Sequence, residues 1–222
     1  MKALLLDTET TGIGEGHHAI EVAICLYDLE LGVPLSSFAS LIRSATNEAE
    51  HINRIPVAAL GTAPGPAAVW SAVLPYALQS DVIVAHRAEF DRGFVPRELA
   101  ELRPWICSKF DVEFGEEHGV GPGLVHLALS LGLGVASAHR AMTDVDTMAR
   151  IFTRAREMGH SLPDMITRAQ RPKARFQALV SYDDRELAKR AGFEWDPEKK
   201  TWERTMFEDR AAELTFKTRK VG

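Results

Sequence analysis

The sequence predicts an α/β fold, in which a mixed sheet flanked by helices precedes a small α+β domain. Short Val-, Ile- and Leu-rich segments alternate with segments whose apolar residues recur at helical spacing, which is typical of a three-layer α/β domain. Hydrophobic residues make up 45% and charged residues 26%, as in ordinary globular proteins. Seven aromatic residues fall within 163–222, where the character of the chain changes. We therefore expect a main domain at 1–158, a linker at 159–174 and an accessory domain at 175–222.

The expected sheet of the main domain begins with three antiparallel strands. Residues 2–8, 20–27 and 35–42 are apolar and rich in strand-forming residues, and Gly32 and Pro34 mark a turn between the second and the third. Two shorter extended segments complete the sheet, and helices cover it. We expect these further strands at 82–85 and 104–107, and helices at 48–60, 67–78, 89–102, 124–133 and 141–157. A loop rich in glycine is expected at 115–123.

The accessory domain is expected to combine strands and helices around its aromatic residues. The segments are a strand at 175–181, a helix at 183–191, a hairpin of 193–195 with 201–204, and a closing helix at 209–216. Its tryptophans serve either as the core of a domain of about 50 residues or as stacking surfaces for a single strand. Lys189, Arg190, Lys199 and Lys200 are candidates for contacts with a nucleic-acid backbone.

Charge and cysteine content narrow the possible functions. The net charge is −5, which argues against a nonspecific nucleic-acid coat protein. Residues 163–222 carry 14 basic and 11 acidic side chains, a balance of +3, so residues 1–162 carry −8. A domain this acidic can act on a polyanion if its carboxylates hold divalent cations. Cys25 and Cys107 are the only cysteines and no apolar run reaches the roughly 18 residues of a membrane span, so we expect a cytoplasmic protein.

Two acidic residues stand at the end of the first expected strand. Residues two apart in a strand point to the same side, so Asp7 and Glu9 aim their carboxylates at one place. Two like charges this close are unfavourable unless a cation lies between them, and Mg²⁺ and Mn²⁺ prefer oxygen ligands. Taken alone, the pattern also fits a solvated strand end that leads into a turn.

Two further segments place chemically active side chains at helix starts. His86-Arg87-Ala88-Glu89-Phe90-Asp91 follows a short strand and opens a helix, where a carboxylate is favoured by the helix dipole. His139 precedes the helix at 141–157, and Asp144 lies in its first turns. Histidine titrates near neutrality and can take a proton from water at working pH. Asp146 competes with Asp144, but it points about 200° away on a helix, so both cannot face one site.

Together the three segments resemble the motifs of the DnaQ-like, or DEDDh, 3′–5′ exonucleases, which have a ribonuclease H-like fold. The resemblance covers about residues 1–158. Asp7, Glu9, Asp91 and Asp144 match the four family carboxylates, and His139, five residues before Asp144, matches the histidine of this branch. The resemblance implies that the four carboxylates hold two divalent cations, Mg²⁺ or Mn²⁺, and that His139 takes a proton from the attacking water.

The resemblance also implies a substrate and the residues that contact it. The expected partner is nucleic acid with a free 3′ end, DNA before RNA, cut to nucleoside 5′-monophosphates. Arg87 departs from the family, which commonly has Asn there, and an arginine can bind phosphate with two hydrogen bonds. For His86 the alternative to substrate contact is a structural role. For the threonines the alternative is formation of the turn. The candidate substrate-binding residues are Thr8, Thr10, Thr11, Gly12, His86, Arg87 and Phe90.

Other functions stay open at this point. The same site can serve an exoribonuclease acting on RNA tails or short oligoribonucleotides. A proofreading subunit would need a polymerase partner, and the sequence contains no convincing polymerase-docking tail or clamp-binding peptide. From a different class, the chain could be an inert relative that only binds nucleic acid or protein. Four converging carboxylates argue against the inert alternative, because a binding module has no use for them.

Overall fold

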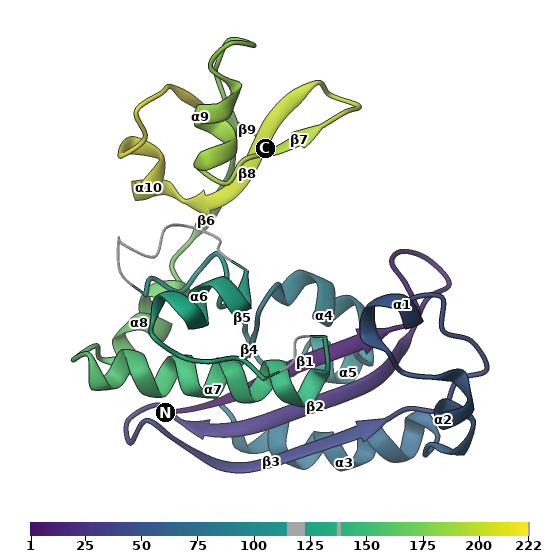
Figure 1. Cartoon of the computed structure of the whole chain (residues 1–222). Helices are drawn as coiled ribbons and strands as arrows, with labels where there is room; N and C mark the ends of the chain where they lie inside the picture. The colour runs from purple at the N-terminus through teal and green to yellow at the C-terminus, as the bar shows by residue number, and fades with distance from the viewer. Residues whose placement is uncertain (115–122, 137–138, 222) are drawn as a thin grey trace.

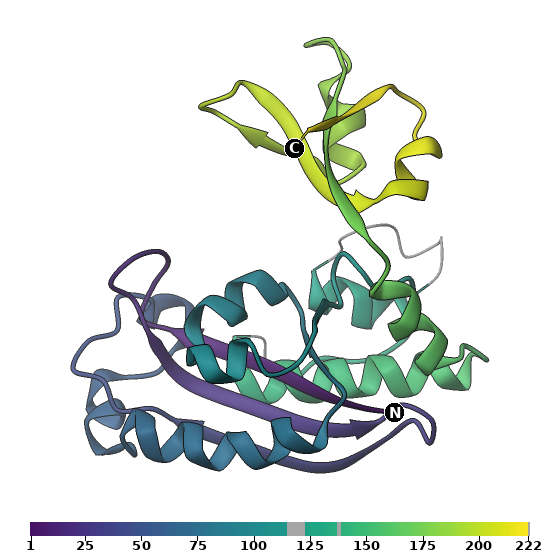
Figure 2. The same cartoon turned by 180° about the vertical axis from the view of Figure 1, so that it is seen from behind.

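The computed structural model describes residues 1–114, 123–136 and 139–221. Within these ranges the strands form one five-stranded and one four-stranded sheet, each in its own part of the chain. Figure 1 shows the smaller unit standing above the layer of α4, α6 and α8, and the reverse view in Figure 2 agrees. The glycine-rich loop expected at 115–123 lies almost wholly outside the described residues. Among the described residues, no helix is long and apolar enough to cross a membrane.

The larger sheet is mixed and has the strand order β3-β2-β1-β4-β5. The antiparallel start is confirmed, because β1 (Lys2–Thr10), β2 (Ala19–Asp28) and β3 (Val33–Leu41) pair in succession. The strands β4 (Val82–Ala85) and β5 (Trp105–Cys107) extend the sheet in parallel beyond β1. β1 is therefore a central strand, and its end is surrounded by neighbouring elements.

Two hydrophobic cores lie on the two faces of this sheet. Successive side chains of a strand point to opposite faces. Accordingly Leu5 joins the core beneath α7 (Ala141–Glu157), and Leu4 joins the core beneath α3 (Pro66–Gln79). α6 (Leu124–Ser130) also contributes to the α7 core. The predicted three-layer arrangement is confirmed, with α7 over the expected residues.

Two of the expected helices are each broken in two by a proline. The helices predicted at 48–60 and 89–102 are wrong as single elements, because Pro56 and Pro96 interrupt them. A residue before proline avoids the helical conformation, and proline has no N–H to donate. The resulting helices are α1 (Glu50–Asn53), α2 (Val57–Thr62), α4 (Ala88–Phe94) and α5 (Arg97–Ala100).

The connecting segment contains a helix that belongs to the first core. α8 (Leu162–Ala169) begins at Ser161, whose side chain accepts a hydrogen bond from the Asp164 backbone N–H. Its apolar side chains Met165 and Ile166 are buried in the core beneath α7. The segment 159–174 thus connects the two units and also adds a packed helix to the larger one.

The C-terminal unit is a four-stranded antiparallel sheet with the order β7-β8-β6-β9. The predicted hairpin is confirmed, but the expected closing helix at 209–216 is wrong in extent. It ends early, and the chain continues as a further strand, β9, which pairs with β6. Ala188 and Phe193 lie in the core of this unit. Its elements are β6 (Lys173–Ala178), α9 (Arg185–Arg190), β7 (Glu194–Asp196), β8 (Thr201–Phe207), α10 (Glu208–Ala212) and β9 (Thr218–Val221).

Candidate active site

Three carboxylates converge where β1 ends beside the start of α7. Asp7 and Glu9 project from the same side of β1, as their spacing predicts. Asp144 lies in the first turn of α7, where the helix dipole favours a negative charge. One oxygen atom of each of these three residues lies within 4.8 Å of the others. Asp146, the competitor in the sequence, is exposed on α7.

The fourth carboxylate, Asp91, lies beside this group and is held in place by β1. It is 2% exposed and stands on α4. Its Oδ1 accepts hydrogen bonds from the backbone N–H of Thr8 at 2.9 Å and from the Thr8 hydroxyl at 2.8 Å. Its negative charge helps to raise the pKa of Asp7. The strand and the helix that carry the first two motifs are thereby joined through Thr8.

Burial and mutual repulsion make the ionised forms of these carboxylates unfavourable. Burial first, and then the charges of Asp91, Asp144 and Glu9, raise the pKa of Asp7 well above its ordinary value. Burial and the charge of Asp144 raise the pKa of Glu9 to about 8. Burial raises the pKa of Asp91 to about 7, against the hydrogen bonds from Thr8 and the positive charge of Arg87. The pKa of Asp144 is also raised, by burial.

This donor set fits a hard divalent cation. Mg²⁺ and Mn²⁺ bind carboxylate oxygens, and a cation among crowded carboxylates removes the repulsion that raises their pKa values. Asp7, Glu9 and Asp144 are the described residues whose oxygens lie near enough to share one ion. Asp91, the fourth carboxylate that the sequence predicted, is not part of this group of three.

In the turn after β1, the threonine side chains form hydrogen bonds within the turn itself. The threonines of this segment are buried, and the Thr10 hydroxyl donates to the Gly12 carbonyl at 2.7 Å. The Thr11 hydroxyl lies 3.1 Å from His17 Nδ1 and accepts from the His18 backbone N–H. A Cβ at Gly12 would lie 2.4 Å from the His17 ring, so a larger residue there would require that ring to move. These hydroxyls hold the turn together, and the contacts left for a substrate are backbone groups.

The second motif places its side chains at the entrance to α4. His86 Nδ1 lies 3.0 Å from the Ser108 hydroxyl, which ties this entrance to the segment after β5. Arg87 is exposed and has a φ of 105°, in the left-handed region that is costly for any residue with a side chain. Phe90 is partly exposed, and its ring lies 4.8 Å from that of Phe94.

The third motif is anchored by a carboxylate to which the sequence analysis assigned no role. Glu21 on β2 accepts two hydrogen bonds from the Arg140 guanidinium, at 2.8 and 3.1 Å, and one from the Ala141 backbone N–H. Arg140 follows His139, which is exposed and has a left-handed φ of 64°. The Glu21–Arg140 ion pair therefore fixes the chain next to the candidate base. The signal in the sequence is that Glu21 is the one charged residue within the apolar stretch 19–27.

Comparison with known families covers both parts of the chain. A family model described as "Exonuclease" matches residues 4–152, and one described as a domain of unknown function matches residues 174–221. The DNA polymerase III subunit epsilon of Treponema pallidum is 31% identical over 171 residues, which cover 69% of this chain and 78% of that protein.

Solved structures share the fold. Exonuclease X, in complex with 5′-overhanging duplex DNA, has a TM-score of 0.55 at 24% identity and covers 75% of this chain and 99% of its own. The nuclease domain of 3′hExo, described as a DEDDh family member bound to rAMP, has a TM-score of 0.57 at 17% identity, with coverages of 72% and 94%. Cell-death related nuclease 4 has a TM-score of 0.59 at 15% identity, with coverages of 100% and 81%. The family match over residues 4–152, the epsilon-subunit relative and the ribonuclease H-like exonuclease fold agree, and the chain belongs to the DnaQ-like DEDDh exonuclease family.

Proposed function

We propose that this protein is a divalent-metal-dependent 3′–5′ exonuclease that releases nucleoside 5′-monophosphates from single-stranded DNA. The observation that carries the proposal is the convergence of Asp7, Glu9 and Asp144, with their oxygens within 4.8 Å, in a member of an exonuclease family. A chain that only bound nucleic acid would carry the cost of these buried carboxylates without any benefit from them.

Each polar group of the site has a role in this proposal. Asp7, Glu9, Asp91 and Asp144 hold the cations, which when bound stabilise the charge that develops on the attacking and leaving oxygens. His139, at the start of α7, accepts the proton of the attacking water. Thr8 keeps Asp91 against β1 through two hydrogen bonds. Backbone groups of Thr10, Thr11 and Gly12, together with Arg87 and Phe90, contact the terminal nucleotide.

The DNA preference is supported by the relatives. Exonuclease X is described in complex with DNA, exonuclease I of E. coli with a dA16 oligonucleotide, and the 31% identical relative is a DNA polymerase subunit. Another neighbour of the same fold is a 3′-exonuclease that recognises a histone mRNA stem-loop. Exoribonuclease activity is therefore the second candidate, and the experiment has to compare the two sugars.

The proposal is tested by digesting 5′-labelled single-stranded DNA and RNA with Mg²⁺, Mn²⁺ or EDTA. We expect a metal-dependent ladder that shortens from the 3′ end and appears earlier with DNA. Asp144→Asn should slow the reaction by about 10²–10³-fold or more, the typical cost of losing a charge-stabilising group. Asp146→Asn, an exposed aspartate two residues further along α7, is the matched control and should retain activity.

Two outcomes would contradict the proposal. Near-normal cleavage by Asp144→Asn would remove this carboxylate from the metal site. Failure of the wild-type protein to cut either strand with any cation, while it still bound them, would support the inert binding module. Faster digestion of RNA than of DNA would replace the proposed substrate by RNA and leave the site assignment intact.

A further inference from the structure

A cleft of about 580 Å³ lies between the nuclease unit and the C-terminal unit. One wall is formed by α4 and the segment after β5, and it includes Arg87, Phe90 and Phe110. The other wall is formed by β6 and β8, and it includes Lys173, Arg175 and Arg204. Its volume is within the range of about 300–1,000 Å³ that ligand sites usually have.

The cleft and the candidate active site share the helix α4. Arg87 and Phe90 line it, and the next residue of α4 is Asp91, the buried carboxylate beside Asp7. A strand whose 3′ end lies among the carboxylates therefore has this cleft as a neighbouring path for its preceding nucleotides. The C-terminal unit supplies the far wall, so the path exists only in the complete chain.

The positive charges of the cleft are only partly neutralised. Two of its carboxylates are already occupied, because Asp111 pairs with Lys173 and Glu203 pairs with Arg175. The Arg87 side chain forms no salt bridge with the described residues, although its charge lowers the pKa of the buried Asp91. Arg87 and Arg175 are exposed, so both are accessible to a ligand that carries negative charge.

Arg204 adds a positive charge behind the wall. One of its terminal nitrogens donates to the Ala191 carbonyl, but its buried Nε has no hydrogen-bond partner among the described residues. Gly192 lines the cleft next to it, and a Cβ there would lie 3.3 Å from the guanidinium. A half-buried cation that forms no salt bridge with the described residues attracts an anion to the adjacent surface, although the charge of Asp111 also acts on it. The remaining cleft carboxylates, Glu89 and Glu194, are exposed.

Aromatic rings accompany these cations on the nuclease wall. Phe90, Trp105 and Phe110 line the cleft and are each partly exposed. The Trp105 indole N–H donates to the Ala100 carbonyl, which fixes the orientation of its ring. Cations that follow a phosphate backbone and rings on which bases stack are the combination that grooves for single-stranded nucleic acid use.

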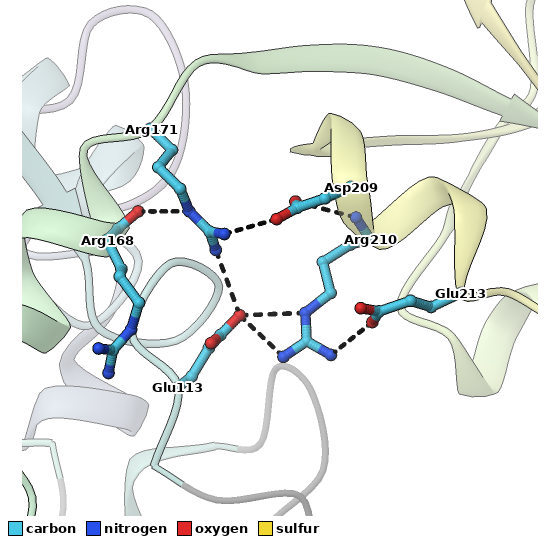
Figure 3. A network of polar contacts seen from close by, with 6 residues as sticks. All are labelled: Glu113, Arg168, Arg171, Asp209, Arg210 and Glu213. Carbon is cyan, nitrogen blue, oxygen red and sulfur yellow. Dashed lines mark hydrogen bonds and ion pairs between the residues drawn. The ribbon is translucent and has the colours of Figure 1, made fainter.

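A network of ion pairs holds the two walls at their spacing (Figure 3). Glu113, in the segment after β5, accepts from Arg210 of α10 at 2.8 Å and pairs with Arg171 at 3.5 Å. Arg171 also pairs with Asp209 of α10. The Lys173–Asp111 pair, at 2.6 Å, joins the two walls within the cleft itself. The C-terminal unit is thus clamped on the nuclease unit along one edge.

We propose that this cleft binds the phosphodiester backbone of the substrate strand on the 5′ side of the nucleotide being removed. The inference rests on the proposed exonuclease function and adds a role for the C-terminal unit. That unit extends the substrate site with a cationic wall, which favours strands long enough to reach from the carboxylates into the cleft.

The test compares strand lengths in a double variant that removes one cation from each wall. Arg92, an exposed residue of α4 that also lines the cleft, donates through its Nε to the Ala100 carbonyl and is replaced in Arg92→Gln. On the other wall, Arg175→Gln leaves Glu203 paired with Lys199 and Thr201. Binding of a single strand of about 12 nucleotides is measured in EDTA by fluorescence anisotropy at several salt concentrations. We expect roughly 10- to 30-fold weaker binding, and a salt dependence reduced by about 0.7 per lost phosphate contact.

Hydrolysis distinguishes failure of the cleft from failure of the proposed activity. The KM for the long strand should rise more than the KM for a dinucleotide, which has one scissile bond and no further strand. Arg97→Gln/Arg219→Gln also removes one exposed arginine from each unit, but neither residue is part of the cleft, and this variant should bind like the wild type. Equal losses in both double variants, or none in the cleft variant, would overturn the proposal. A wild type that binds through the cleft but cuts nothing would overturn only the exonuclease assignment.

Discussion

Burial and mutual repulsion make ionisation of the active-site carboxylates unfavourable, and a bound cation would reduce this cost. Asp7 and Glu9 are presented by one strand, and burial raises the pKa of Glu9 to about 8 from an ordinary value of 4.5. A group whose pKa is raised by folding stabilises the folded protein below its unfolded pKa, and this contribution disappears as the pH rises through the folded pKa. The metal-free protein should therefore lose stability between about pH 4.5 and 8.

This gives a prediction for thermal unfolding with and without cations. In EDTA, the Tm should fall as the pH is raised from about 6 to 8.5, because Glu9 and its neighbours ionise without a partner. Mn²⁺ at about 100 times its Kd adds about 2.7 kcal/mol, which corresponds to roughly 5–10 °C for a chain of this size. Scanning calorimetry of the wild type and of Asp7→Asn measures both effects. A cation-induced rise that persists in Asp7→Asn would contradict the site.

At the scale of elements, local residue spacing predicts individual helices and strands, but it does not predict which distant segments pair. The helix at 141–157 follows from its apolar periodicity, and the D-x-E spacing places two carboxylates on one side of β1. The breaks at Pro56 and Pro96 could also have been expected, because proline ends a helix locally. β9 has no such signal, since it is a four-residue strand whose stability comes from pairing with β6.

Within the site, the Glu21–Arg140 ion pair is another contact that local sequence patterns do not predict. Its two residues are 119 positions apart, so no local pattern joins them, although a lone acid in an apolar strand indicates a buried charge that needs a partner. The pair links β2 to the first residue of α7 and so sets where His139 stands. The catalytic role of His139 itself stays a prediction.

Glu21→Gln is expected to act through the placement of His139. It removes the charge that holds Arg140, so turnover should fall by roughly 10–100-fold, the usual cost of losing a residue that orients an active group. KM should change little. Glu21→Asp should recover part of the activity, and the pH–rate profile of Glu21→Gln should approach that of His139→Ala. Glu50→Gln, an exposed glutamate of α1, is the control. Wild-type turnover in Glu21→Gln would show that the ion pair has no influence on the base.

At the scale of the whole molecule, one small interface connects the two units. The nuclease unit buries its own two cores, and the C-terminal unit has a separate core around Ala188 and Phe193. The described contacts between the units are dominated by ion pairs, with Glu113 at their centre (Figure 3). Partly exposed ion pairs are each worth about 0.2–1 kcal/mol, so the clamp is strong enough to bias the arrangement and weak enough to be broken by one substitution.

Glu113→Lys should therefore loosen the units without unfolding either of them. The new cation repels Arg171 and Arg210. A change of about 1–2 kcal/mol should raise the KM for a long strand by about 5- to 30-fold, while the KM for the dinucleotide is affected less. Calorimetry should show the unfolding of the two units further apart in temperature than in the wild type, since part of the coupling between them is lost. Glu213→Lys is the matched control, because Glu213 pairs with Arg210 across one turn and does not reach the nuclease unit. If Glu213→Lys behaved like Glu113→Lys, the effect would come from Arg210 within the C-terminal unit and not from the contact between the units.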